Sequence, residues 1–192
     1  MYFVILLIIG AGVVLLVLQQ QGKLSAGKAT SGKLPAAERN LFNLEIGDLV
    51  QYQGDDWFVE GKLIYNDSGD TWFSYLLQND EGICWLSVEE DDLVEVGIYK
   101  KTVLDLDNPP ATTLEYLEEK YHQSGQGVAV MKRLGNTLDR QEETCEYYDY
   151  EGDRNLRLSV EVWNGEIEVS SGEKINPRML AFLPGDGQRV YG

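Results

Sequence analysis

The chain has 192 residues, which is enough for one ordinary domain and an appendage, and its formal net charge is −16. The charge is uneven, because residues 41–192 carry 12 Lys and Arg against 31 Asp and Glu, a net charge of −19. Nucleic-acid phosphates repel such a body, so nucleic acid is excluded as an expected partner. The acidic residues either serve solubility or attract basic partners.

The first segment of the chain is apolar. Tyr2 to Leu18 is a run of 17 residues without a charge, and a helix over this run spans ~25 Å. We predict a transmembrane anchor over residues 1–21, with a cleaved signal peptide or a buried core helix as alternatives. Basic residues follow the run and none precedes it, namely Lys23, Lys28, Lys33 and Arg39. We therefore expect a single-pass protein of a bacterial plasma or thylakoid membrane, with a cytoplasmic C-terminal body.

Residues 22–40 are rich in Gly, Ser, Ala and Lys and predict a flexible linker, so that the folded domain comprises residues 41–192. Within this domain, turn residues break the chain around Gly54, Gly69 and Gly82. The runs between the breaks are rich in Val, Ile, Tyr, Trp and Phe. They predict strands over residues 49–53, 57–65, 71–78 and 83–88.

Two short helices are predicted farther along the chain. In "NPPATTLEYLEEKYHQ", Thr112 and Glu115 have the spacing of a capping box, and Leu114, Leu117 and Tyr121 share one side of a helix. Asn176-Pro177 is typical of a helix start and predicts a second helix over "RMLAFL". Between them, "GVAVMKRL" predicts a strand.

The stretch "LSVEVWNGEIEV", residues 158–169, predicts a β-hairpin around Asn164-Gly165. Counting across the turn pairs Val162 with Ile167 and Val160 with Val169, so that these four side chains share one face. Residues 86–89 repeat the Leu-Ser-Val-Glu of residues 158–161. We interpret both copies as strands with Leu and Val toward the core and with Ser and Glu toward solvent. The predicted fold is mainly β, an antiparallel barrel- or sandwich-like domain with one or two helices.

Three stretches together resemble a known family: "GDLVQYQGDDWFVEGKLIY", "WFSYLLQNDEGICWLSVEEDD" and "YYDYEGDRNLRLSVEVWNGEIEVSSGEKI". The family is domain of unknown function 4178, and the resemblance extends from about Gly47 to Ile175. It implies a bacterial, mostly β domain of unestablished activity, found alone or beside membrane-associated partners. It carries no catalytic residue over to this chain. The predicted N-terminal anchor and linker depart from many members of the family.

Candidate catalytic and metal-binding residues are few. His122 is the single histidine and falls near the end of a predicted helix, where a surface position is expected. Cys84 alternates within a strand and is expected to be a buried, reduced thiol, and Cys145 lies among acidic residues that disfavour a thiolate. The acidic clusters at 89–92 and 149–153 lack the pattern of an EF-hand, and solvated turns are favoured over a metal site. We predict no catalytic residue, no cofactor and no metal.

A surface for a partner is the remaining candidate site. Tryptophans flank predicted turns, and the alternatives are a second packed layer or an exposed aromatic patch rimmed by carboxylates. The candidate partner-binding residues are Trp57, Trp72, Glu89, Glu90, Asp91, Asp92, Asp149, Asp153 and Trp163.

The leading functional hypothesis is a membrane-anchored, non-enzymatic adaptor, assembly factor or accessory subunit. Its expected partners are the lipid bilayer, through the N-terminal helix, and membrane proteins with basic cytoplasmic loops. The alternative is a small-molecule- or metal-binding module, or an enzyme, with its site in the mouth of a barrel.

Overall fold

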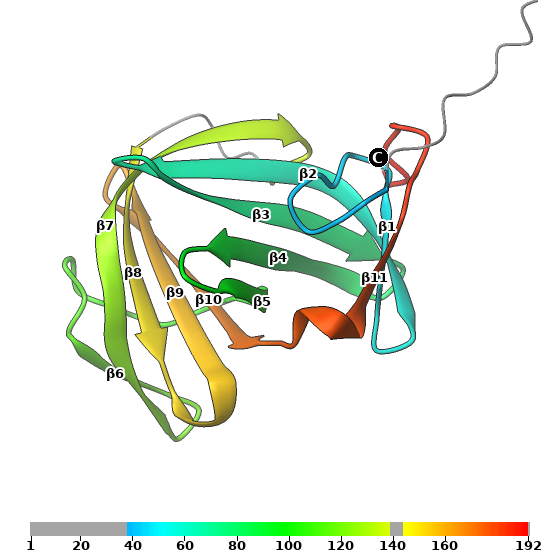
Figure 1. Ribbon diagram of the computed structural model, residues 1–192. Coiled ribbons are helices and arrows are strands. Elements are labelled where there is room, and N and C mark those ends of the chain that lie inside the picture. The colour runs from blue at the N-terminus through cyan, green and yellow to red at the C-terminus, as the bar shows by residue number, and fades with distance from the viewer. Residues whose placement is uncertain (1–37, 139–143, 192) are drawn as a thin grey trace, which may run out of the picture. The chain divides into compact units, whose positions relative to one another are not determined.

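The computed structural model describes residues 38–138 and 144–191, which form one antiparallel sheet of eleven strands. Along the sheet their order is β11-β1-β2-β3-β4-β5-β10-β9-β8-β7-β6 (Figure 1). The strands are β1 (Leu49–Tyr52), β2 (Asp55–Asp67), β3 (Asp70–Asn79), β4 (Gly82–Glu90), β5 (Val94–Thr102), β6 (Thr113–Tyr116), β7 (Glu119–Gly135), β8 (Thr144–Glu151), β9 (Leu156–Trp163), β10 (Glu166–Lys174) and β11 (Leu180–Leu183).

Two long strands close the sheet into a barrel. The second half of β2 pairs with the end of β7, from Gly61 opposite Gly135 to Asn66 opposite Val130. Eight strands, β2 to β5 and β7 to β10, thereby form a closed antiparallel wall. Hairpins join most neighbours, which accounts for the regular spacing of turn residues along the sequence.

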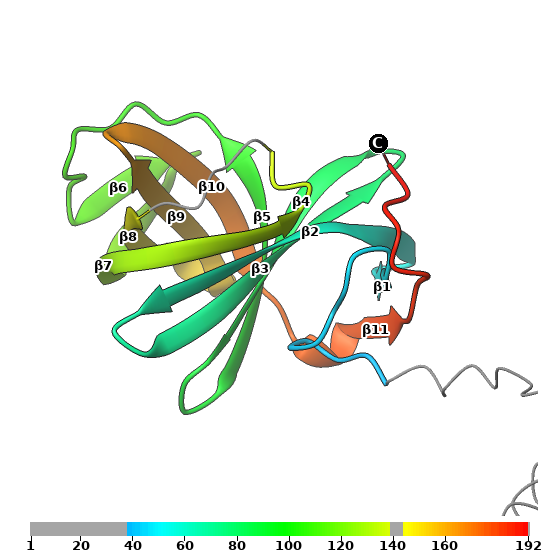
Figure 2. The same cartoon turned by 90° about the horizontal axis from the view of Figure 1, so that it is seen from above.

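The first half of β2 pairs with β1, and β1 pairs with β11, so this part of the sheet extends beyond the barrel wall. In Figure 2 the β1–β11 pair and β6 lie at opposite ends of the molecule.

Two hydrophobic layers lie against the outer surface of the wall. The first joins Leu44, Val50 and partly buried Leu180 and Phe182 to apolar side chains of β3, β4 and β5. The second joins Leu114 of β6, and Leu104 and Leu106 of the preceding segment, to apolar side chains of β8, β9 and β10. A third cluster, which includes Leu63, Leu76 and Met131, fills part of the barrel interior. The two outer layers therefore contain most of the apolar side chains of the wall. The part of the interior that the third cluster does not fill can hold polar side chains.

The predicted β9–β10 hairpin is confirmed. Ile167 lies opposite Val162 and Val169 opposite Val160, and the turn residues Asn164 and Gly165 both have positive φ angles. Leu158, Val160 and Val162 are buried in a hydrophobic core, as predicted, but this core is the second outer layer and the solvent-facing position predicted for Ser159 and Glu161 is wrong. Side chains alternate along a strand, so Ser159 and Glu161 point into the barrel.

The helix predicted after Pro110 is wrong. Residues 113–122 instead form the β6–β7 hairpin, with Leu114 opposite Tyr121. Its two turn residues, Leu117 and Glu118, have φ angles of 50° and 65°, which are incompatible with an α-helix. Over so short a stretch, the spacing of the apolar residues is compatible with both the helical period of 3.6 residues and the strand period of two. Packing of Leu114 and Tyr121 against β8–β10 decides for strands.

The second predicted helix is also wrong. Asn176 caps a single 3₁₀ turn, Pro177–Met179, by accepting a hydrogen bond from the Arg178 amide. The chain then pairs with β1 as β11 and does not continue as a helix. Asn176-Pro177 thus starts a helical turn, as predicted, but the residues after Met179 pair with β1 and form a strand.

The prediction of a transmembrane helix, and with it of a single-pass membrane location, is corrected. Across residues 38–138 and 144–191, no helix is long and apolar enough to cross a membrane. The apolar run Tyr2–Leu18 lies outside the described residues, and so does most of the predicted linker. The boundaries drawn for these two segments stay predictions.

Candidate functional site

The barrel interior contains a cavity of about 370 Å³ that we call the lumen site. Its polar lining comes from alternate residues of the wall strands. Both copies of Leu-Ser-Val-Glu contribute, because Ser87 and Glu89 of β4 and Ser159 and Glu161 of β9 line the cavity, while the Leu and Val residues face outward. Repetition of the motif thus places the same pair of polar side chains on two separate walls.

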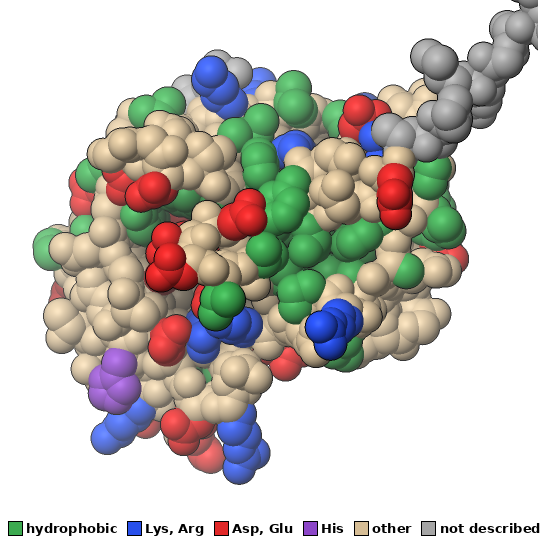
Figure 3. All heavy atoms as spheres, viewed as in Figure 1, with side chains coloured by type: hydrophobic (Ala, Val, Ile, Leu, Met, Phe, Trp, Pro, Cys, Tyr) green, Lys and Arg blue, Asp and Glu red, His purple; other side chains and the backbone are tan. Residues whose placement is uncertain are grey.

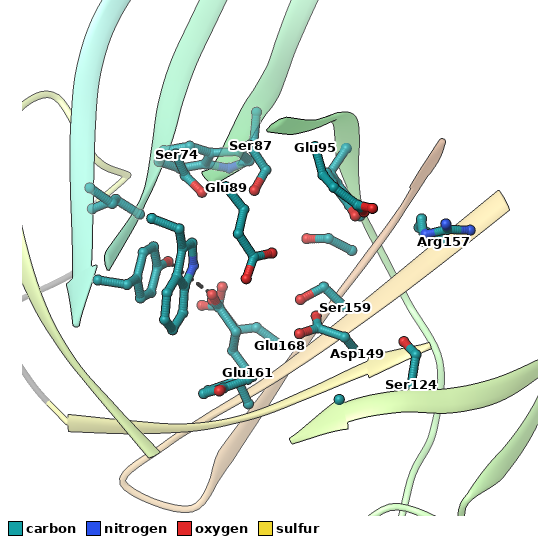
Figure 4. Close-up of a pocket in the computed structure, with 18 of the residues that line it drawn as sticks. Ser74, Ser87, Glu89, Glu95, Ser124, Asp149, Arg157, Ser159, Glu161 and Glu168 are labelled. Atoms are coloured by element: carbon teal, nitrogen blue, oxygen red, sulfur yellow. Dashed lines mark hydrogen bonds between the residues drawn. The ribbon is translucent and has the colours of Figure 1, made fainter. Parts of the chain in front are cut away.

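Carboxylates dominate the lining of the lumen site. Six acidic residues from five strands contribute, namely Glu89, Glu95, Asp149, Glu151, Glu161 and Glu168. Five serines, Ser74, Ser87, Ser124, Ser159 and Ser170, add hydroxyl groups. Figure 4 shows Glu89 pointing into the cavity, with Ser159 and Asp149 on the facing wall. Acidic side chains also gather in Figure 3 over the half of the molecule that carries β7–β10, whereas hydrophobic side chains gather over β2 and β3.

The basic groups near the lumen site are already paired. Arg157, the one basic residue in the lining, contacts Glu151 at 3.0 Å and donates a hydrogen bond to the Leu156 carbonyl. Lys174 pairs with Glu95, and Lys101 lies 3.4 Å from Glu168. These cations neutralise three of the acids that line the cavity, Glu151, Glu95 and Glu168. They leave Glu89 and Asp149 without a basic partner among the ion pairs described.

The remaining acids differ in their polar contacts. Glu161 accepts hydrogen bonds from the Tyr65 hydroxyl at 2.8 Å and from the Trp163 indole at 3.2 Å. Ser159 hydrogen-bonds to Asp149. Within the part of the chain that the structure describes, the carboxylate of Glu89 has neither a hydrogen bond nor an ion pair.

Aromatic rings form the other part of the lining. Tyr65 and Trp72 stack in parallel with ring centroids 5.1 Å apart, and Tyr147 meets Trp72 edge-on at 5.2 Å. Trp85 and Tyr99 complete this set. The Tyr99 ring lies close against the backbones of Gly97 and Gly172, because a Cβ atom at either position would come within 3.0 Å of the ring. Glycine at these two positions therefore makes room for the ring.

The surroundings raise the pKa values of two of the acids, Asp149 and Glu89. Desolvation, together with the charges of Glu89 and Glu161, raises the pKa of Asp149 to about 7, although the Ser159 hydrogen bond opposes this. Desolvation raises the pKa of Glu89 as well, and Glu95, Asp91 and Asp70 add to it. Ionised carboxylates in this cavity repel one another, so a bound cation would stabilise them.

The lumen site includes only part of the predicted partner-binding set. Trp72, Glu89 and Asp149 line the cavity. Trp163 donates a hydrogen bond to Glu161, which also lines it. The other predicted residues lie elsewhere: Trp57 packs on the first outer layer, Glu90, Asp91 and Asp92 are exposed around the β4–β5 turn, and Asp153 is exposed in a single 3₁₀ turn after β8. Their role in binding a partner stays a prediction.

Several lumen residues were missed in the sequence analysis, chiefly Glu95, Tyr99, Tyr147, Glu161 and Glu168. The signal that could have revealed them is the strict alternation of Ser and Glu with Leu and Val in β4 and β9. On an open sheet this alternation places the polar residues in solvent, and only closure of the barrel turns them inward.

Other candidate groups lie away from the lumen site. His122 is exposed on β7, where its ring nitrogen lies 3.4 Å from the Thr113 hydroxyl. Cys84 is buried in the first outer layer, as predicted, and burial raises the pKa of its thiol to about 12. Among the residues with described positions, no three His, Cys, Asp or Glu side chains are grouped so as to hold a metal ion.

Comparison with known proteins identifies relatives of the chain. Uncharacterised proteins of Mycobacterium bovis and Mycobacterium tuberculosis are 25% identical to it over 146 residues, which cover 72% of this chain and 70% of theirs. No solved structure matches the chain. Residues 45–177, which include β1 to β10, match the family described as Domain of unknown function (DUF4178). The chain belongs to this family.

Proposed function

We propose that the protein binds an organic cation in the lumen site. The observation that carries the proposal is the charge of the lining: six carboxylates face one arginine, and that arginine is paired with Glu151. The raised pKa of Asp149 is consistent with this, since desolvation is its main cause and the charges of Glu89 and Glu161 add to it.

The aromatic lining favours an organic cation over a bare ion. Ring faces attract alkylammonium groups through their negative electrostatic potential, and they pack against the attached carbon atoms. Tyr65, Trp72 and Tyr147 form a connected group of rings in the same cavity as the acids. A ligand with a positive charge and an apolar part would match both components of the lining.

The proposal can be tested by titrating the purified full chain and following tryptophan fluorescence, since Trp72 and Trp85 line the cavity. Butylammonium and tetramethylammonium serve as probes, with butanol and butyrate as neutral and anionic counterparts. We expect saturable changes with the cations alone. Glu89→Gln, which removes a lumen charge, should weaken binding, whereas Glu90→Gln, on the same strand but outside the lining, should leave it unchanged. Equal responses to butanol, or equal affinity in both variants, would contradict the proposal.

Docking on a basic protein is a second proposal, supported by the β4–β5 turn. The acids Glu90, Asp91 and Asp92 and the exposed Leu93 lie between Glu89 and Glu95, which are paired across β4 and β5 and both line the lumen site. A basic side chain that enters the lumen would bring its own protein against this turn. Pull-down of a basic partner that survives Glu89→Gln but is lost on neutralising residues 90–92 would support docking at the turn.

A further inference from the structure

Two buried carboxylates hold the segment that follows β11, residues 184–191. The first is Asp48, which accepts a hydrogen bond from the Gly185 amide at 2.8 Å. The second is Glu60, which is fully buried and accepts hydrogen bonds at 2.8 and 2.9 Å from the backbone amides of residues 190 and 191. In Figure 2 the segment runs from β11 past β1 to the turn between β3 and β4. We call residues 186–191 the strap.

The attachment at Asp48 is neutralised and closely packed. Arg39 lies 2.7 Å from the carboxylate oxygen of Asp48 that the Gly185 amide does not use, so the buried charge has a counter-charge. The backbones of Gly47 and Gly185 also meet closely, because a Cβ atom on Gly185 would clash with the carbonyl oxygen of Gly47. This end of the strap is therefore a firm anchor.

The attachment at Glu60 carries an energetic cost. Both strap amides donate to one oxygen of Glu60, Oε1, while Oε2 is buried without a hydrogen-bond partner among the described residues. None of the ion pairs described for this part of the chain involves Glu60. A buried carboxylate with an unsatisfied oxygen and no counter-charge is costly, and water would reach it if the strap lifted. The strap therefore opens more easily at Glu60 than at Asp48.

Two side-chain contacts of Tyr191 offset this cost. Its ring meets Phe58 edge-on, with centroids 6.2 Å apart, and its hydroxyl donates a hydrogen bond to Asp80 at 2.9 Å. Phe58 lies opposite Gln78, which comes two residues after Leu76 of the third hydrophobic cluster and so shares its face of β3. The docked strap thus covers the inner side of the sheet next to the third cluster.

Glu60 also lies at the closure of the barrel. It is the extra residue of a β-bulge in β2, at the point where β2 stops pairing with β1 and begins to pair with β7. We call the pairing of residues 61–66 with residues 130–135 the seam. The Glu60 carbonyl oxygen accepts a hydrogen bond at 2.8 Å from the amide of Asn136, the residue directly after the seam. One residue thereby binds the strap through its side chain and the end of the seam through its backbone.

We propose that the strap is a conformational latch for the barrel, which holds the seam shut while it is docked on Glu60. When the strap lifts, the Glu60 side chain turns toward water, and the bulge backbone that binds the Asn136 amide moves with it. The end of the seam then opens before the rest of the domain. Because Leu63 and Tyr65 lie in the seam and line the lumen site, this opening changes one wall of that cavity. The latch does not depend on what the lumen site binds.

Amide hydrogen exchange of the full chain, resolved to single residues, tests the latch because it measures local opening. Three groups of amides are compared: that of Tyr191 in the strap, that of Asn136 at the end of the seam, and those of the β9–β10 hairpin, which lies in another part of the wall. In the unaltered chain we expect the Tyr191 amide to exchange at least about tenfold faster than the hairpin amides.

Two variants with matched controls loosen the strap. Val190→Pro removes one N–H donor to Glu60, whereas Val190→Ala keeps this donor and shortens a half-exposed side chain. Asp80→Ala removes the acceptor of the Tyr191 hydroxyl, whereas Glu81→Ala removes the exposed acid beside it. In Val190→Pro and Asp80→Ala we expect the Asn136 amide to exchange about five- to tenfold faster, as for the loss of one hydrogen bond. The hairpin amides, and both controls, should stay within about twofold of the unaltered chain.

The outcomes decide for or against the latch. Faster exchange at Asn136 in Val190→Pro and Asp80→Ala, with an unchanged hairpin, supports it. Faster exchange at Tyr191 without a change at Asn136 would show that the strap is a passive tail. Equal acceleration of the hairpin amides would show a loss of stability of the whole domain and would overturn the proposal. It would also be overturned if the Tyr191 amide of the unaltered chain exchanged as slowly as the hairpin.

Discussion

The carboxylate of Glu89 on β4 acts across the barrel lumen on that of Asp149 on β8, and it helps raise the pKa of Asp149 to about 7. Desolvation is the larger cause, and Glu161 adds to the effect. The two strands are far apart along the chain, so the relationship exists only because the barrel is closed. Because of desolvation and this interaction, Asp149 titrates near neutral pH in the folded protein but not in the unfolded chain.

The first prediction concerns stability. Asp149 has a higher pKa in the folded chain than its usual 3.8, so the folded state binds more protons and stability falls as pH rises through this range to about 7. Asp149→Asn removes the charge, and we expect it to stabilise the protein at about pH 8 by on the order of 1–3 kcal/mol. The gain should shrink toward about pH 4, where Asp149 is protonated. Urea unfolding across this range measures it.

Asp153→Asn is the control for this experiment, because Asp153 is exposed and outside the lumen lining. Residual pH dependence in Asp149→Asn is expected, since the pKa of Glu89 is raised too. A loss of stability at alkaline pH in Asp149→Asn would show that the folded state stabilises the ionised carboxylate, contrary to the argument above.

The second prediction concerns cation binding. A proton on Asp149 competes with a bound cation, so affinity should decrease as pH falls through about 7. Glu89, Glu161, Tyr99, Tyr147 and Arg157 also line this space, and the proton affinity of the site reflects all of them. For one competing proton, the dissociation constant should be about tenfold higher at about pH 6 than at about pH 8. Titration with putrescine at both values measures the ratio.

In Asp149→Asn, the ratio of the putrescine dissociation constants at these two pH values should approach one, although binding is weaker at every pH. A ratio that is unchanged by the substitution would assign the competing proton to another group in the lumen, most directly Glu89.

The third prediction concerns barrel closure. A Cβ atom at Gly61 would lie 1.6 Å from the Asn136 carbonyl oxygen, whose backbone crosses β2 at the end of its pairing with β7. Gly61→Ala must displace this backbone, and we expect a loss of stability of about 1–3 kcal/mol, as for other overpacked sites. Gly82→Ala is the matched control, since nothing lies within 4 Å of its Cβ position. Equal stabilities of the two variants in urea unfolding would argue against the observed closure.

The fourth prediction distinguishes the β6–β7 hairpin from the helix expected from the sequence. Leu117 and Glu118 occupy turn positions with positive φ, and Leu117 is 80% exposed. Leu117→Asn together with Glu118→Gly fits these angles better and should stabilise the protein by about 0.5–1 kcal/mol. In a helix the same double substitution would destabilise by roughly 1 kcal/mol or more. Thermal unfolding gives the sign of the change, with Glu115→Gly within β6 as a destabilising control.

The sequence by itself determined the local features that depend on neighbouring residues. Asn164-Gly165 adopts positive φ angles and sets the register of β9 and β10, and turn residues separate β2, β3 and β4 at about the predicted positions. Cys84 is buried because it alternates with Ile83 and Trp85 in a strand that packs under another layer. Family membership also followed from the sequence, through residues 45–177.

Only the tertiary structure decided which face of each strand is interior. Alternation assigns Ser87, Glu89, Ser159 and Glu161 to one face, but whether that face meets water or a cavity depends on the pairing of β2 with β7. The same holds for residues 113–122 and 180–183, where short apolar patterns suit a helix or a strand equally and pairing with a distant strand selects the strand. The acids of the lumen site come from five strands, and no local pattern specifies that they meet, because long-range strand pairing brings them together.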